Sequence, residues 1–318
     1  MKFVKVLTGA ALGVSMSFAA HAQSVAIGTS AQGTATYNIG SAIAKVLGEK
    51  TGIKIVVQPQ GSTGKVAPLV NAGRVAFGLA NILETTYATK GTGTFKGKPH
   101  PNMKVIAVIY PFVTGYFVRK DHPAKTINDV KGLKISSEYK SHSIIQVLAT
   151  AHLANAGLEW KDVKGVPASN IIANANDFTQ GKTDVGFFAL ASGKVRQMNA
   201  AVGGLRFLDV DDSPEARARM LKYTPQAQIF TVKPRKGLVL KKPTKLMVYD
   251  YMFYAGAHVS DDVVYKITKA MAENKKALGA AFGGFKGLNP KRMHKINGLD
   301  YHPGALKYYK EAGLLATK

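Results

Sequence analysis

An apolar run, a polar turn and a helical pattern follow one another three times within residues 25–89, and this repetition limits the fold most. The apolar runs are residues 25–27, 53–57 and 75–79, and each precedes apolar residues at helical spacing. Strands that alternate with helices in this way imply an open parallel sheet, whose ligands lie outside the carboxyl ends of the strands. The sequence therefore predicts an α/β fold.

The first polar turn, residues 28–36, is rich in groups that suit an anion. Gly33 allows a tight backbone turn, and Ser30 and Thr34 add hydroxyl groups beside it. A helix that begins here offers free N–H groups and the positive end of its dipole to a carboxylate or a phosphate. The alternative is a plain strand-to-helix turn with Thr36 as the helix cap.

Residues 1–22 have the layout of a secretory signal peptide. A positively charged start precedes an apolar segment at 6–20, and Ala20 and Ala22 form a small-x-small cleavage site. No later stretch reaches the roughly 18 apolar residues that a membrane span needs. We expect cleavage after Ala22 and a mature chain in the periplasm.

The composition excludes some chemistry and favours anionic ligands. The chain has no cysteine, so a disulfide, a thiolate metal site and a cysteine nucleophile are impossible. Its formal net charge of +24 raises the local concentration of anions, which include acidic metabolites and lipid headgroups. The cations are scattered and do not form a stripe with interleaved aromatic residues, so we expect no nucleic-acid partner.

The sequence contains no motif for a cofactor or a metal ion. Gly91, Gly93 and Gly97 have the spacing of neither a Walker A loop nor a dinucleotide-binding loop. The aspartates within residues 209–212 lack the glycine and the distal glutamate of a calcium-binding EF-hand loop, and Asp212 is the expected helix cap. We therefore expect no cofactor and no metal.

The alternation of strands and helices breaks at residues 104–119, which indicate two successive strands around Pro111. Such a break is where a chain can cross from one lobe to another. The return crossing is expected within residues 223–246, whose lysines and arginines form either a solvated basic face or a docking patch for a membrane partner. The crossings divide the mature chain into one lobe of residues 23–113 and 235–318 and a second lobe of residues 114–234.

Six segments carry a resemblance to a known family: residues 27–52, 57–81, 129–136, 180–188, 260–274 and 301–313. In their order and spacing they resemble the TAXI family, the extracytoplasmic receptors of tripartite ATP-independent periplasmic (TRAP) transporters. The resemblance implies a type II-like periplasmic binding protein fold, with two α/β lobes and a ligand cleft between them. It also implies a small anionic organic solute, mainly a carboxylate, and TRAP permease subunits as partners.

The resemblance also places the first-lobe ligand residues. Ser30, Thr34 and Tyr37 fall where the family holds a carboxylate. The residues that match the second binding loop are Gln60, Ser62 and Thr63. Asn81 falls where relatives often carry a polar residue.

The second lobe departs from the family pattern, because residues 136–143 read SSEYKSHS and contain no glycine. A strand still delivers the hydroxyls of Ser136 and Ser141 to a helix start. Lys140 or His142 would then pair with the acid, and Lys140→Ala should weaken its binding by roughly tenfold or more, the loss of about one charge-assisted bond. Aromatic packing is expected from Tyr110, Tyr139 or Phe188.

Two other functions stay open. An exported hydrolase could use Ser141 or Ser143 with a nearby base, and a binding protein of this kind could serve signalling instead of transport. The chain has no G-x-S-x-G turn and no H-E-x-x-H zinc motif, so we expect that it is not an enzyme.

Overall fold

The computed structural model of this chain describes residues 24–317. Its strands are β1 (Ser24–Thr29), β2 (Lys54–Pro59), β3 (Phe77–Asn81), β4 (Met103–Arg119), β5 (Lys134–Glu138), β6 (Lys164–Ala168), β7 (Gly186–Ala189), β8 (Leu205–Phe207), β9 (Gln228–Val232) and β10 (Thr244–Gly256). Its α-helices are α1 (Ala35–Thr51), α2 (Val66–Asn71), α3 (Ile82–Lys90), α4 (Ser143–Asn155), α5 (Ile171–Thr179), α6 (Gly193–Ala201), α7 (Pro214–Leu221), α8 (Asp261–Glu273), α9 (Lys275–Ala281) and α10 (Pro303–Glu311). The predicted signal peptide, residues 1–22, lies outside the described residues.

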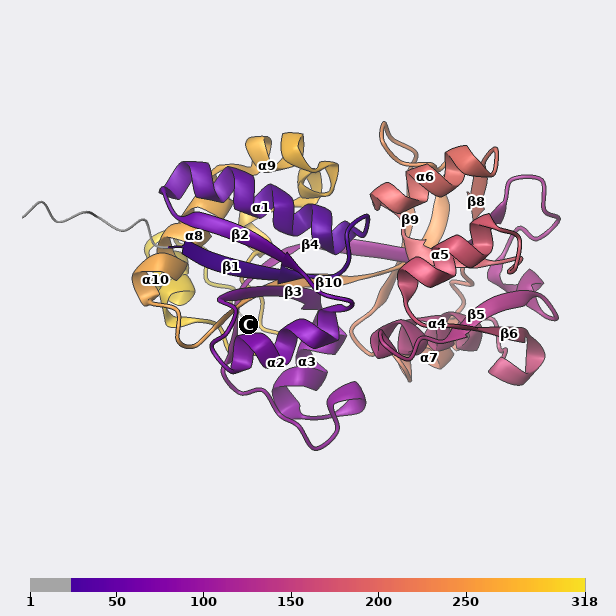
Figure 1. Cartoon of the computed structure of the whole chain (residues 1–318), viewed down its shortest axis with the longest axis horizontal. Coiled ribbons are helices and arrows are strands. Elements are labelled where there is room, and N and C mark those ends of the chain that lie inside the picture. The colour runs from indigo at the N-terminus through magenta and orange to yellow at the C-terminus, as the bar shows by residue number, and fades with distance from the viewer. Residues whose placement is uncertain (1–23, 318) are drawn as a thin grey trace, which may run out of the picture.

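The elements form two bodies that lie side by side (Figure 1). The first body contains β1 to β3, α1 to α3 and the C-terminal helices α8 to α10, whereas the second contains β5 to β8 and α4 to α7. The long strands β4 and β10 run between them. The exact lobe boundaries given by the sequence stay a prediction.

One eight-stranded sheet passes through both bodies, in the order β2-β1-β3-β10-β4-β7, with β8 paired to β4 and β9 paired to β10. Strand β1 is parallel to β2 and β3, which agrees with the strand-helix alternation. Strand β10 is antiparallel to β3, β4 and β9, so the sheet is mixed and the prediction of a parallel sheet was wrong for this part. The cause is that β4, in which the chain crosses from the first body to the second, pairs with β10, in which it returns.

The outward crossing is one strand of 17 residues, whereas the sequence predicted two strands around Pro111. Pro111 lies opposite Asp250, and the register between β4 and β10 shifts between Asp250 and Met252. Proline lacks the N–H that a regular ladder needs, and an irregularity in the ladder tolerates its absence. The strand therefore continues through the proline.

Helix α1 begins at the loop that the sequence singled out. Thr34 is its N-cap, because the Thr34 Oγ1 accepts a hydrogen bond from the Tyr37 N–H at 3.2 Å. The alternative with Thr36 as the cap was wrong, since Thr36 lies inside the first turn. The helix buries Ile39, Ile43, Val46 and Leu47 and ends at Gly52, whose φ of 72° favours glycine.

Side-chain caps begin other helices too. Asn81 caps α3 and Ser260 caps α8. Ser213 caps α7, whereas Asp212 was the expected cap. The Asp212 carboxylate instead pairs with Arg217 and lies 3.7 Å from the Lys245 ammonium.

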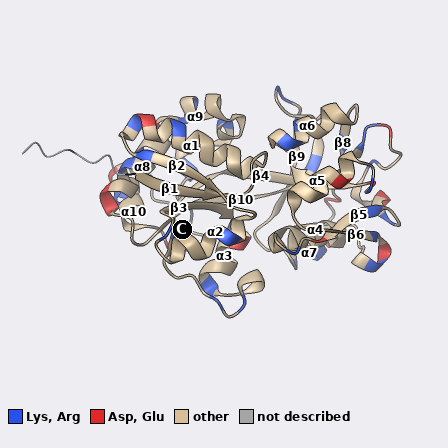
Figure 2. Ribbon diagram, in the orientation of Figure 1, with Lys and Arg blue, Asp and Glu red and all other residues tan. Residues whose placement is uncertain are grey.

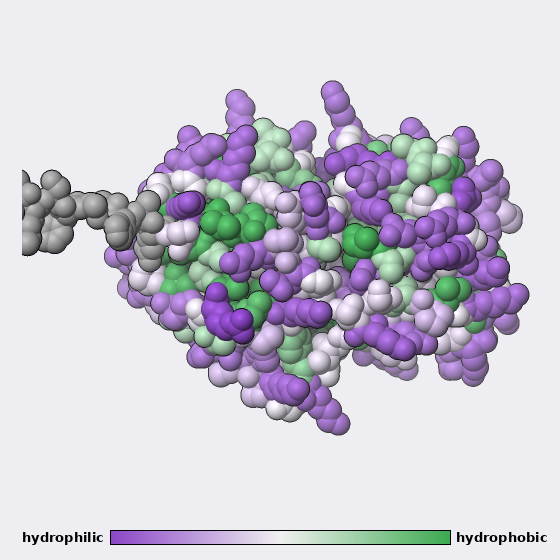
Figure 3. Space-filling view, in the orientation of Figure 1, coloured by the Kyte–Doolittle hydropathy of each residue, from purple (hydrophilic) through white to green (hydrophobic). Residues whose placement is uncertain are grey.

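Buried apolar side chains from both bodies and from the long strands form one large core, and a smaller cluster lies around α2. Hydrophilic residues cover most of the visible face, and hydrophobic residues occur there in small groups (Figure 3). Lysines and arginines lie on both bodies (Figure 2).

Candidate functional site

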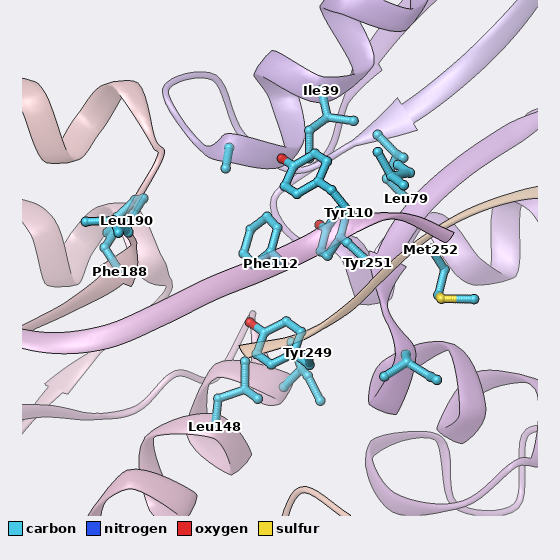
Figure 4. Close-up of a cluster of buried hydrophobic side chains, with 14 of the residues drawn as sticks. Ile39, Leu79, Tyr110, Phe112, Leu148, Phe188, Leu190, Tyr249, Tyr251 and Met252 are labelled. Carbon is cyan, nitrogen blue, oxygen red and sulfur yellow. The ribbon is translucent and has the colours of Figure 1, made fainter. Parts of the chain in front are cut away.

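A cavity of about 50 Å³ lies between the two bodies and is lined by both of them and by the long strands. Figure 4 shows its aromatic wall, with Phe112 on β4 next to Tyr249 and Tyr251 on β10. The residues that line the cavity are Ser30, Thr34, Ala35, Thr36, Thr63, Asn81, Phe112, Thr114, His142, Ile144, Ile145, Leu148, Ile171, Phe187, Phe188, Ala189, Tyr249 and Tyr251.

The first body presents a polar face to this cavity. The Ser30 and Thr34 hydroxyls lie 2.8 Å apart, and the Thr34 hydroxyl donates to the Ala31 carbonyl at 2.7 Å. Ala35 and Thr36, the first residues of α1, also line the cavity, and the first turn of α1 contains no acidic residue. Free N–H groups and the positive end of the helix dipole therefore face the cavity.

A buried carboxyl lies directly behind this polar face. Glu84 is 3% exposed, and it accepts a hydrogen bond from the Thr63 hydroxyl, which lines the cavity. Burial raises the pKa of Glu84 to about 7, and the Thr63 hydrogen bond opposes part of that rise. The Asn81 Oδ1 accepts from the Glu84 N–H at 2.8 Å, which leaves the Asn81 amide N–H₂ to donate toward the cavity.

The long strands supply an aromatic wall. The Phe112 ring stacks on the Tyr251 ring with 4.2 Å between centroids and lies 5.7 Å from the Tyr249 ring. The Thr114 hydroxyl is buried beside the Tyr249 hydroxyl, without a hydrogen bond of normal geometry within residues 24–317. This wall can pack on an apolar ligand body and still offer a hydroxyl.

The second body presents a mostly apolar face. Its apolar residues at the cavity are Ile144, Ile145, Leu148, Ile171, Phe187, Phe188 and Ala189. His142 is 5% exposed, and its Nδ1 is buried without a hydrogen-bond partner among the described residues. Burial lowers the pKa of His142 to about 4, so the ring is neutral at pH 7.

The structure brings six of the predicted ligand residues to this cavity: Ser30, Thr34, Thr63, Asn81, His142 and Phe188. Four others do not line it: Tyr37, Gln60, Ser62 and Ser136. Tyr110 lines a neighbouring cavity.

Lys140, Ser141 and Tyr139 lie away from the cavity. The Lys140 side chain is 78% exposed and its ammonium lies 3.1 Å from the Glu138 carboxylate, while the Ser141 hydroxyl donates to the Ser169 carbonyl at 2.8 Å. Tyr139 is fully buried, and its hydroxyl donates to Asn174 at 3.3 Å. Glu138 and Tyr139 both have positive φ, 67° and 38°, and after this left-handed turn the Lys140 side chain points to solvent.

Sequence reasoning missed Glu84, Phe112, Thr114, Tyr249 and Tyr251. Tyr249 and Tyr251 alternate along a strand, so the spacing placed both on one face, but it did not show what lies opposite. Phe112 and Tyr249 are direct register partners across β4 and β10. That pairing joins segments far apart in sequence, and no local signal predicts it.

Within residues 24–317 no hydrogen bond joins Ser141 or Ser143 to a histidine, and no group of three or more His, Asp or Glu side chains is placed to hold a metal ion. Each helix in the same range is too short or too polar to cross a bilayer.

Comparisons with known proteins agree on the fold. A family model described as NMT1-like matches residues 27–313. A solved structure of a periplasmic transporter has a TM-score of 0.61 at 16% identity, with 93% of this chain and 94% of that chain covered.

Two further structures have bound ligands. PhnD1 from Prochlorococcus marinus, in complex with methylphosphonate, has a TM-score of 0.55 at 14% identity, with 92% of this chain and 99% of that chain covered. The amino acid ABC transporter substrate-binding protein AbpA from Streptococcus pneumoniae, bound to L-arginine, has a TM-score of 0.51 at 12% identity, with 83% and 95% covered. At these identities the likeness shows the mixed α/β fold of periplasmic binding proteins.

Proposed function

Because this chain belongs to the NMT1-like family, we propose that it is an exported solute-binding protein that holds a small organic acid between its two bodies. One observation carries the proposal. The start of α1 and His142, whose buried Nδ1 has no partner among the described residues, line the same cavity from different bodies, with apolar side chains around them. A buried polar atom without a partner is unfavourable, so a ligand that bonds to it stabilises the closed arrangement.

The charges around the cavity support an acid as the ligand. Within the described chain, the lining of this cavity contains no Asp, Glu, Lys or Arg. The donors there are the N–H groups at the N-terminus of α1 and the Asn81 amide, and these favour a carboxylate. The remaining wall is apolar or aromatic, which favours an acid with an apolar body.

Contacts between the bodies support a closing motion. The Gly33 carbonyl accepts hydrogen bonds from the Ser192 hydroxyl and from the Lys194 N–H, both at 3.1 Å. These bonds connect the first ligand loop to the start of α6 in the second body. A ligand that touches both faces would favour the state in which they form.

The partner we propose is a TRAP permease in the inner membrane, and its support is the resemblance of the sequence to the TAXI family. Some proteins with similar structures serve ABC transporters, as AbpA from Streptococcus pneumoniae does. Reconstitution of the chain with each type of permease in vesicles separates the two. Ligand uptake that needs an ion gradient and no ATP is expected, and uptake that needs ATP would contradict the TRAP assignment.

A thermal-shift and calorimetry screen tests the ligand class. We expect small carboxylic acids to raise the melting temperature, since a ligand at 100 times its dissociation constant adds about 2.7 kcal/mol of stability. Methylphosphonate and L-arginine are the comparison ligands. Tighter binding of either one than of every carboxylate would contradict the carboxylate assignment, and consumption of a bound ester or amide would indicate the hydrolase instead.

A further inference from the structure

A second and larger cavity lies next to the first one. Its volume is about 240 Å³, against about 50 Å³ for the first. The two cavities share three lining residues, Ala35, Phe112 and Ala189. Two of the three carry only a methyl group, so the border consists of one aromatic ring and two small side chains.

The second cavity has an apolar lining with one charged group. Its apolar side chains come from both bodies and include Leu190, Phe230, Val232, Leu238 and Val248. Among the residues that line the two cavities within the described chain, Arg235 is the one lysine or arginine. The sequence predicted Lys140 as the cation of the site, whereas the cation that lines these cavities is Arg235, in the return crossing.

A buried hydroxyl accompanies Arg235. Tyr110 is 6% exposed, and its hydroxyl has no hydrogen-bond partner among residues 24–317. Gly284 lies against this hydroxyl, since a Cβ at Gly284 would be 2.7 Å from the Tyr110 oxygen. Burial raises the pKa of Tyr110 far above its usual value while the positive charge of Arg235 acts against the rise, so the hydroxyl is a neutral donor close to that charge.

These features form a second place for an anion. A guanidinium binds a carboxylate through two parallel N–H donors, and a buried hydroxyl can add a third. The polar face of the first cavity and the Arg235 end of the second are separated by the apolar strip at Phe112. A ligand that satisfies both ends needs two anionic groups and an apolar segment between them.

Resting on the proposed function, we infer that the ligand is an elongated dicarboxylic acid. One carboxylate lies at the start of α1 beside Thr34. The apolar segment passes between the Phe112 ring and the Ala189 methyl group, and the second carboxylate is held by Arg235 and Tyr110. Both bodies line both cavities, so one such molecule links them along its whole length.

Calorimetry on the mature chain with matched acids tests this. The probes are hexanoate, octanoate and decanoate, each compared with the dicarboxylate of the same length. We expect at least one dicarboxylate to bind tenfold or more tightly than its monoacid, at one molecule per chain, because it gains a charge-assisted interaction.

Two variants test which residues cause the tighter binding of the dicarboxylate. Arg235→Gln should bring the ratio of monoacid to dicarboxylate dissociation constants to about one, and Ala189→Leu should lower that ratio by narrowing the passage. Lys233→Gln is the matched control, because it removes the same charge two residues away and Lys233 lines neither cavity. Melting curves of each variant verify that it folds.

The outcomes separate this inference from the proposed function. Three results would overturn the inference: dicarboxylates that bind no more tightly than monoacids at any length, two ligands bound per chain, or equal effects of Arg235→Gln and Lys233→Gln. If monoacids still bind, the proposed function remains intact. If neither class of acid binds the wild-type chain, the proposed function itself is wrong.

Discussion

The two faces of the first cavity differ in chemistry. The first body contributes hydroxyls, an amide and the start of α1, whereas the second contributes seven apolar side chains and the single neutral ring of His142. The sequence predicted that both lobes would direct hydroxyls and helix starts at the ligand. The structure shows this for one body, so we infer that the first body anchors the charged end of the ligand and the second covers its apolar part.

The difference arises from the turns after two strands. After β1 the chain turns at Gly33 and leads directly into α1, so Ser30 and Thr34 stay at the cavity. After β5 it makes a left-handed turn at Glu138 and Tyr139, and that turn directs Lys140 to solvent.

A carboxylate placed on the anchoring face should have the largest effect. Thr34→Asp keeps a good N-cap for α1 but puts a negative charge where we expect the acid. We expect acid affinity to fall at least a hundredfold, which is about 2.7 kcal/mol, with little change in melting temperature. Thr34→Ser is the control and should bind nearly as the wild type does. A Thr34→Asp protein that binds acids normally would show that the anchor lies elsewhere.

The buried carboxyl behind the anchoring face should make stability depend on pH. The pKa of Glu84 is raised from 4.5 to about 7, so between these values the folded chain holds a proton that the unfolded chain has lost. The contribution of Glu84 to the free energy of unfolding therefore falls as pH rises from 4.5 to 7, by on the order of 3 kcal/mol.

Denaturant unfolding of wild type and Glu84→Gln at several pH values measures this contribution. The difference between the two proteins isolates Glu84, because the buried His142 and His152, with pKa values lowered to about 4, act in the opposite direction in both. Glu49→Gln, at an exposed glutamate, is the control. Equal pH dependence in wild type and Glu84→Gln would assign the titration to another group.

A small change on the covering face should affect acids and neutral ligands alike. Ile145→Val removes one methyl group that lines the cavity, and the loss of about 0.8 kcal/mol should weaken binding about fourfold. Calorimetry with an acid and its neutral amide compares the two. The same fold-loss for both supports an apolar cover, whereas a loss confined to the acid would mean that this face recognises charge.

Removal of the exposed lysine should have the smallest effect. Lys140→Ala should leave acid affinity within about twofold, since Lys140 pairs with Glu138 in a solvent-exposed position and such pairs contribute little. This replaces the tenfold loss expected from the sequence. A tenfold loss of affinity in calorimetry would show that Lys140 belongs to the binding site.

The sequence could predict the anchoring face because its determinants are local. A strand, a turn and a helix follow one another within a few residues, so Ser30, Thr34 and Asn81 could be placed by their distance from a helix start. The covering face depends on a left-handed turn at two residues that are not glycine, and residue type gave no sign of it.

The aromatic wall of the cavity could not be predicted from the sequence, for a different reason. Phe112 meets Tyr249 and Tyr251 only because the outward and return crossings pair antiparallel. Arg235 was visible as one of several cations in the return crossing, but its place at a cavity depends on that same pairing.

The most direct test is a crystal structure of the mature chain with the tightest-binding acid from the screen. We expect the acid between the two bodies, with one carboxylate bonded to N–H groups at the start of α1 beside Thr34, and with its apolar part against Leu148 and Phe188. A carboxylate held by the second body alone, or an acid bound outside the cavity, would contradict the division into an anchoring face and a covering face.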